Sequence, residues 1–171
     1  MTRKNHFFAK DIVSIKDFSR EDLEFIFQAT DVINKSGPDE KSELGKGRTL
    51  GYIFYEPSTR TRMSFEAAMA SLGGSSIGIF DSKFSSIEKG ESLADTVRIM
   101  DLYSDIIVLR HPRDGSSRYA AELSNNPIIN AGSGSEEHPT QAMLDLYTIK
   151  KEKGKDIWLF GGGTLFRSLL N

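Results

Sequence analysis

Apolar residues along the chain follow two spacings that alternate from one end of the sequence to the other. Short runs rich in β-branched and aromatic residues predict strands, and segments with apolar residues three or four positions apart predict helices. Strands are expected at residues 48–56, 75–80, 105–110, 127–130 and 156–163. Helices are expected from Ser19 to Gly37, from the stretch at 58–62 as far as Gly73, at about 92–103, near 116–123, and from Pro139 through Lys150.

This alternation predicts an α/β fold, an open parallel sheet flanked by helices on both faces. The run "DIIVLR" at 105–110 is apolar on both faces, which is typical of a central strand. Ligands of such sheets bind beyond the carboxyl ends of the strands. The stretch at 58–62, Arg110 and the loop with His138 each lie at the end of a predicted strand, so we expect them to converge on one edge of the sheet.

Composition and charge narrow the possible functions. A net charge of −2 and a pI near 5.9 predict no nucleic-acid partner, so any anion site must be a local group of donors. The absence of cysteine excludes disulfides, and three widely separated histidines argue against a metal site. No apolar run is long enough for a signal peptide or a membrane span. We therefore expect a cytoplasmic enzyme or binding domain.

The stretch "STRTR" at 58–62 places hydroxyls and arginines where a strand gives way to a helix. A helix amino terminus offers unpaired N–H groups and a positive dipole end, both of which favour an anion. Ser58, Thr59 and Thr61 add hydroxyl donors, and Arg60 adds a planar fork suited to phosphate or carboxylate. The alternative is a serine cap followed by solvated arginines. We favour a phosphate site, and the missing GxxxxGK[ST] loop argues against a nucleoside triphosphate.

Four further residues are candidates, and each has a simpler interpretation. Arg110 could be a surface charge at a strand exit, and His138 could be a hydrogen-bonded loop residue before Pro139. Gln141 lies three residues beyond His138, so the two side chains can face one ligand. Lys89, next to a glycine in the polar loop 81–91, could be a solvated charge or could reach a ligand from outside. The run "FGGGTLFRS" matches no nucleotide-binding motif.

Four motifs together resemble one known family. "EPSTRTRMSFE", "SSIEKGESLADT", "VLRHP" and "HPTQAMLDLYTI" are similar to the carbamoyl-phosphate half of the carbamoyltransferases that use aspartate or ornithine. The resemblance covers nearly the whole chain as far as Phe160. Ornithine-type members share the STRTR and HPxQ elements but lack a lysine at the "KGE" motif. Lys89 and Thr140 therefore favour aspartate over ornithine as the acceptor.

The resemblance implies a role for each matching residue. Ser58, Thr59, Arg60 and Thr61 would hold the phosphate of carbamoyl phosphate, and Arg110 and His138, with Thr61, would polarise its carbonyl. Gln141 would bind the carbamoyl amino group. Ser85 and Lys89 would reach the active site of a neighbouring subunit in a homotrimer, and a regulatory subunit is possible. No metal or organic cofactor is expected.

The resemblance also implies an organisation into domains. Residues 1–160 would form the carbamoyl-phosphate-binding domain, and 161–171 an atypical tail, in which Arg167 is assigned no role. The family members are about twice as long, so we expect a truncated form without the aspartate-binding domain. The implied reaction makes N-carbamoyl-L-aspartate and phosphate from carbamoyl phosphate and L-aspartate, in pyrimidine biosynthesis. The alternatives are an inactive fragment that binds carbamoyl phosphate and, more weakly supported, an ornithine carbamoyltransferase.

Overall fold

The computed structural model describes residues 7–80, 90–135 and 137–152. Its strands are β1 (Thr49–Phe54), β2 (Ser75–Ile79), β3 (Ile106–His111) and β4 (Ile128–Ser133). A short 3₁₀ helix, η1, spans Ile15–Asp17. The α-helices are α1 (Arg20–Lys35), α2 (Pro38–Leu44), α3 (Thr59–Ser71), α4 (Leu93–Tyr103), α5 (Ser116–Leu123) and α6 (Pro139–Lys151). None of the helices in these ranges is both long and apolar enough to cross a membrane.

The four described strands form one parallel sheet in the order β2-β1-β3-β4. The predicted fold class is thereby confirmed, and β3 is central, as its apolar residues on both faces predict. Four of the five predicted strands fall within the described residues, and β4 extends three residues beyond the predicted end at Asn130. The strand predicted at 156–163 and most of the polar loop at 81–91 lie outside the described residues.

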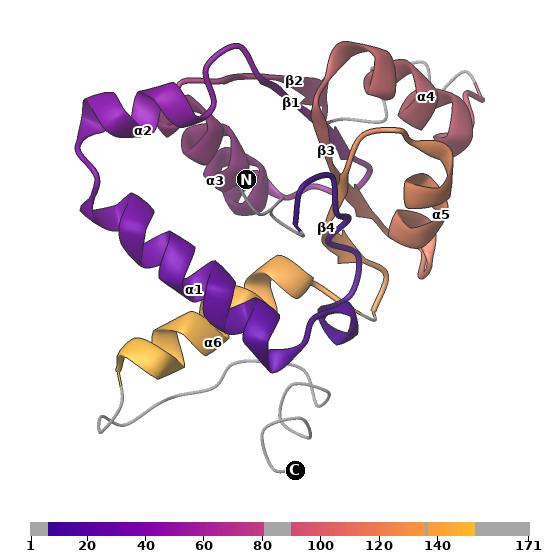
Figure 1. Ribbon diagram of the computed structural model, residues 1–171. Coiled ribbons are helices and arrows are strands. Elements are labelled where there is room, and N and C mark those ends of the chain that lie inside the picture. Colours follow the sequence, from indigo (N-terminus) through magenta and orange to yellow (C-terminus); the bar gives the residue numbers. More distant parts are fainter. Residues whose placement is uncertain (1–6, 81–89, 136, 153–171) are drawn as a thin grey trace.

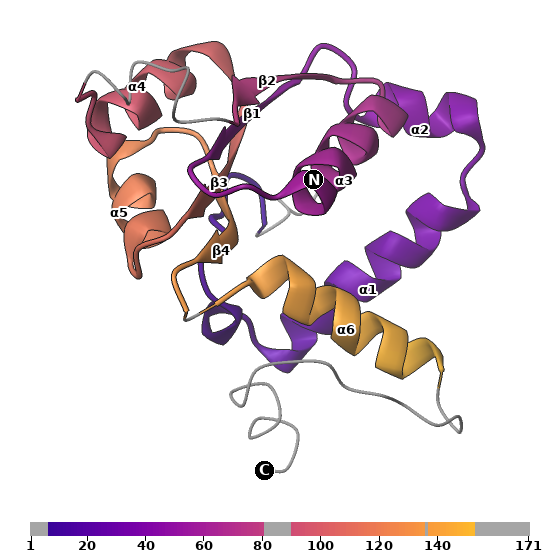
Figure 2. The same ribbon diagram turned by 180° about the vertical axis from the view of Figure 1, so that it is seen from behind.

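Helices cover both faces of the sheet, and alternate residues of the strands fill two separate cores. Helices α4 and α5 lie on one side, and α1, α2, α3 and α6 lie on the other (Figures 1 and 2). On the α4–α5 side the buried residues are Ile53, Val97, Met100, Ile107, Leu109, Ala120 and Ile128. On the α3 side they are Leu50, Tyr52, Phe54, Met69, Val108 and Ala131. Burial on both faces holds the strand ends in fixed relative positions.

The amino-terminal helix α1 is fixed at its start and along its length. Ser19 and Asp22 form the capping box that the sequence suggests, with bonds of 3.1 and 2.9 Å. Helix α1 then packs against α6, where Tyr147 donates a 2.6 Å hydrogen bond to Asp31 and its ring contacts Phe27. These contacts join α1 to α6, the helix that His138 caps.

One helix was not predicted. The sequence predicts that a helix ends at Gly37, and α1 does end at Lys35, but a second helix, α2, begins at Pro38. Proline is well suited to a first helical position because the N–H that it lacks would have no partner there. The Glu40 carboxylate accepts a 3.3 Å hydrogen bond from the Gly37 N–H, which completes this helix start.

Candidate functional site

Three polar groups that are far apart in sequence meet at the carboxyl ends of neighbouring strands. Residues 58–61 follow β1, Arg110 is the penultimate residue of β3, and His138 follows β4. Strand β3 pairs with β1 on one side and with β4 on the other. A backbone bond of 2.9 Å from the Tyr55 N–H to the Arg110 carbonyl continues the β1–β3 pairing past Phe54. The predicted convergence on one edge is therefore a consequence of the strand order.

The amino terminus of α3 is left open for a ligand. Ser58 is the N-cap residue, but its side chain makes no capping hydrogen bond, and no acidic residue lies in the first turn. Thr59 and Arg60 are exposed and Thr61 is half-buried. Of the simpler interpretation, a serine cap followed by solvated arginines, the capping bond is absent, whereas Arg60 is exposed. Free N–H groups, hydroxyls and one guanidinium are together the donor set that a phosphate group requires.

A pocket of about 230 Å³ opens at this helix terminus, lined by Phe54, Pro57, Ser58, Thr59, Arg62 and Phe80. Arg62 lies over the Phe80 ring at 4.1 Å from its centroid, so its guanidinium is held at the pocket wall. Sequence reasoning assigned no role to Arg62. Its position three residues after Thr59 places both side chains on one face of the helix, and this spacing could have indicated a role for Arg62.

Arg110 is held at the end of β3 by two neighbours. Its Nη1 donates a 3.1 Å hydrogen bond to the Ala131 carbonyl, and its Nε lies 3.4 Å from Glu56 Oε2 in an ion pair. The Nε group is buried and makes no hydrogen bond of good geometry with any described residue. Glu56, to which sequence reasoning assigned no role, lies two residues after the end of β1. Its ion pair with Arg110 therefore joins the segment that leads to residues 58–61 to the end of β3.

Gly132 lies between Arg110 and His138. A Cβ built on Gly132 would lie 3.2 Å from Arg110 Nη1 and 3.7 Å from the His138 ring, so both side chains border the space that a side chain at this position would fill. Its φ of +114° is a conformation that other residues rarely adopt. The structure thus brings together two of the sequence-predicted residues, and the absence of a side chain at Gly132 makes their approach possible.

His138 is oriented by the helix that it caps. Its Nδ1 accepts a hydrogen bond from the Gln141 N–H at 3.4 Å, and the Thr140 hydroxyl lies 3.2 Å away. Burial and the positive charge of Arg110 lower the pKa of His138, although Asp145 acts in the opposite direction. A neutral imidazole that accepts at Nδ1 carries its proton on Nε2. The geometry therefore assigns His138 as a hydrogen-bond donor at neutral pH.

The remaining candidates are placed differently. Gln141 is exposed and its amide donates a 2.9 Å hydrogen bond to Asp145, so in this conformation it is held along its own helix. Its backbone, through the bond to His138, is part of the site. Ser85 and Lys89 lie outside the described residues. Among the described residues, no group of three or more histidine, aspartate or glutamate side chains could hold a metal ion.

Replacing Gly132 with alanine is expected to lower stability by about 1–3 kcal/mol and to weaken the binding of inorganic phosphate at this edge of the sheet about tenfold, as for one weakened charge-assisted hydrogen bond. The added methyl group would displace Arg110 and would also strain the backbone. Gly47→Ala is the matched control, because Gly47 has a φ of +72° but nothing within 4 Å of the added Cβ. Calorimetric titration and thermal unfolding of both variants separate the two effects. Equal affinity losses in both would show that contact with Arg110 is irrelevant.

Most of the chain is similar to known proteins. A family profile described as "Aspartate/ornithine carbamoyltransferase, carbamoyl-P binding domain" matches residues 10–151. The aspartate carbamoyltransferase catalytic subunit of Nitrosopumilus maritimus is 69% identical over 151 residues, 88% of this chain and 49% of that protein. The corresponding subunit of Thermococcus kodakarensis is 51% identical over 147 residues, 85% of this chain and 47% of that protein.

Solved structures show the same fold. The aspartate transcarbamoylase of Trypanosoma cruzi, in complex with carbamoyl phosphate and aspartate, superposes with a TM-score of 0.79 at 44% identity. The match covers 86% of this chain and 49% of that one.

The fold and site define an α/β domain with hydroxyl, arginine and histidine side chains at the carboxyl edge of a parallel sheet. The profile match and the identities show which class this is: the chain belongs to the aspartate/ornithine carbamoyltransferase family. The sequence-based family assignment is confirmed. The chain spans about half the length of the curated relatives that it matches.

Proposed function

We propose that this chain is the carbamoyl-phosphate half of an enzyme that transfers a carbamoyl group to L-aspartate. The observation that carries the proposal is the apposition of Arg110 and His138 across Gly132, on the strand edge next to the open amino terminus of α3. The amino terminus of α3 suits a phosphate group, and the pair of Arg110 and His138 suits a carbonyl oxygen. Residues 1–160 form the proposed carbamoyl-phosphate-binding domain.

The proposed roles follow from charge. Ser58, Thr59 and Arg60 hold the phosphate, which is also the leaving group, and the helix dipole supports its negative charge. As the aspartate amine attacks the carbamoyl carbon, a C–N bond forms, the C–O bond to phosphate breaks, and the amine proton passes to the departing phosphate. Charge grows on the carbonyl oxygen during this step. Arg110 and the Nε2–H of His138, with Thr61, stabilise that charge, and Gln141 holds the carbamoyl amino group.

Aspartate is the proposed acceptor because the similar proteins are named aspartate carbamoyltransferases or transcarbamoylases. Lys89 and Thr140, on which the sequence-based choice rested, are consistent with it. We further propose a cytoplasmic homotrimer in which Ser85 and Lys89 act in a neighbouring subunit's site, with a role in pyrimidine biosynthesis. The resemblance of the motif around Lys89 supports this assembly.

Two measurements test the function. Isothermal titration of the chain with carbamoyl phosphate should show saturable binding, and inorganic phosphate should compete with it. Transfer should be assayed in a chimaera that joins residues 1–151 to the remaining half of the N. maritimus relative. Carbamoyl aspartate should form, and ornithine should not replace aspartate. A chain that binds neither anion would contradict the proposal, and carbamoylation of ornithine alone would change the acceptor.

A further inference from the structure

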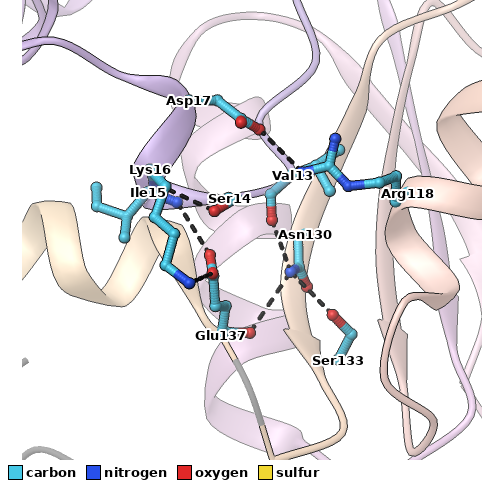
Figure 3. A network of polar contacts seen from close by, with 9 residues as sticks. All are labelled: Val13, Ser14, Ile15, Lys16, Asp17, Arg118, Asn130, Ser133 and Glu137. Carbon is cyan, nitrogen blue, oxygen red and sulfur yellow. Dashed lines mark hydrogen bonds and ion pairs between the residues drawn. The ribbon is translucent and has the colours of Figure 1, made fainter. Parts of the chain in front are cut away.

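Asn130 is at the centre of a network of polar contacts between β4, the loop after it and the amino-terminal segment (Figure 3). The residue is 1% exposed. Its Nδ2 donates hydrogen bonds to the Val13 carbonyl at 2.9 Å and to Ser133 Oγ at 3.0 Å, and lies 3.5 Å from the Glu137 carbonyl. Its Oδ1 accepts a 2.9 Å bond from the Gly132 N–H. One side chain thus contacts both ends of the loop that leads from β4 to His138.

The other side of the network is the amino-terminal segment 12–16. Ile12 pairs with β4 through backbone bonds to Ile128 and Asn130 of 2.8 and 2.9 Å. Glu137 accepts a 3.1 Å bond from the Ile15 N–H, and Lys16 Nζ lies 3.6 Å from its other carboxylate oxygen. Asn130 therefore joins two segments that are more than 100 residues apart in the sequence.

The hydrogen bonds of this network reach the backbone that lies next to Arg110 and His138. The bond to Asn130 Oδ1 fixes the backbone at Gly132, and Arg110 and the His138 ring both lie within 4 Å of where a Cβ of this residue would be. The Ser133 N–H donates a 3.2 Å bond to the Glu137 carbonyl, which closes the loop immediately before His138. The Ala131 carbonyl, between Asn130 and Gly132, accepts the bond from Arg110. Ala131 and Gly132 lie within two positions of Asn130 in the sequence, and Ser133 and Glu137 contact its side chain directly.

We propose that Asn130 is a positioning residue for the reaction, which sets the orientation of Arg110 and His138 by anchoring their shared loop to segment 12–16. The expected change in carbamoyl phosphate binding rests on the proposed function. The structural part of the inference, the orientation of the His138 ring, does not depend on any ligand. A buried amide is costly unless it is fully bonded, and an apolar side chain would fill the same space without this cost. The amide of Asn130 is bonded through both its nitrogen and its oxygen, so it meets this condition and holds the loop in one geometry.

A matched control is available just before the same strand. Asn126, two residues before β4, also donates side-chain bonds, to the carbonyls of Asp101 and Ser104 at 2.9 Å each. It precedes the amino end of β4, away from Gly132. If Asn130 has only a structural role, Asn130→Ala and Asn126→Ala should differ in stability alone. If Asn130 positions the site, only Asn130→Ala should also change His138.

The experiment measures the His138 ring and the binding of carbamoyl phosphate in the 171-residue chain. Long-range ¹H–¹⁵N spectra report the imidazole tautomer, and His138→Gln assigns its signal among the three histidines. Wild type and Asn126→Ala should show the Nε2–H tautomer. Asn130→Ala should show a mixture of tautomers and about a tenfold to hundredfold loss of affinity, as for one lost charge-assisted hydrogen bond. Asn130→Ser can still accept from Gly132, so its effects should be intermediate.

The outcomes separate this inference from the proposed function. An unchanged tautomer and affinity in folded Asn130→Ala, or in Asn130→Ser if the alanine variant does not fold, would overturn the positioning role. Equal changes at His138 in Asn126→Ala would overturn it as well, because they would show a general loss of packing. If the wild-type chain bound no carbamoyl phosphate, the proposed function would fail, while the His138 spectra would still decide the role of Asn130.

Discussion

Replacing Arg60 with alanine is expected to weaken the binding of carbamoyl phosphate and of inorganic phosphate about tenfold to a hundredfold. A hydrogen bond to a charged group contributes about 1.5–3 kcal/mol, and each 1.4 kcal/mol is a factor of ten in affinity. Arg60 is exposed in the first turn of α3, and no ion pair joins it to another described residue. Its loss should therefore leave the free energy of unfolding within about 0.5 kcal/mol of wild type.

Titration calorimetry with both anions measures this effect, and two further variants interpret it. Arg60→Lys keeps the charge but lacks the planar fork, so it should recover only part of the affinity. Arg98→Ala removes an exposed arginine of α4, on the opposite side of the sheet, and should leave the affinity unchanged. Wild-type affinity in Arg60→Ala would remove this residue from the phosphate site and leave Arg62 as the arginine at the pocket wall.

Replacing His138 with alanine is expected to lower kcat about a hundredfold to a thousandfold, with a smaller change in carbamoyl phosphate affinity. The reason is that a donor to the carbonyl oxygen gains strength as charge develops in the transition state. The assay uses the chimaera with an acceptor half described above. A loss of affinity with kcat retained would make His138 a ground-state binding residue only.

A second variant controls for the role of His138 at the start of α6. Loss of an N-cap side chain costs about 0.5–2 kcal/mol, so His138→Ala should also be less stable. Asparagine is a good N-cap, and His138→Asn should recover stability while kcat stays low. Because burial and Arg110 lower the pKa of His138 below 6.5, the capping bond to Gln141 should persist at neutral pH. It should be lost only as the pH falls through that lowered pKa.

The sequence by itself determined the fold class and the general position of the site. The apolar run at 105–110 predicted the central strand, and the alternation of strands with helices predicted a parallel sheet. Parallel strands end at one edge, so the sequence predicted that the stretch at 58–62, Arg110 and His138 share that edge. The strand order, which only the structure shows, makes them neighbours. Local rules also predicted the start of α1, because Ser19 and Asp22 interact within one turn.

The tertiary structure decided which side chains within that region touch. The positions of Gly132 against Arg110 and His138 depend on strand register and on a φ value that composition does not reveal. The pairing of Glu56 with Arg110 and the stacking of Arg62 on Phe80 likewise cross between elements. Asn130 shows the same limit most clearly, because its bond to Val13 joins residues 117 positions apart. Sequence periodicity reports local spacing, whereas these contacts arise only when β4 pairs with its neighbours and segment 12–16 folds back against it.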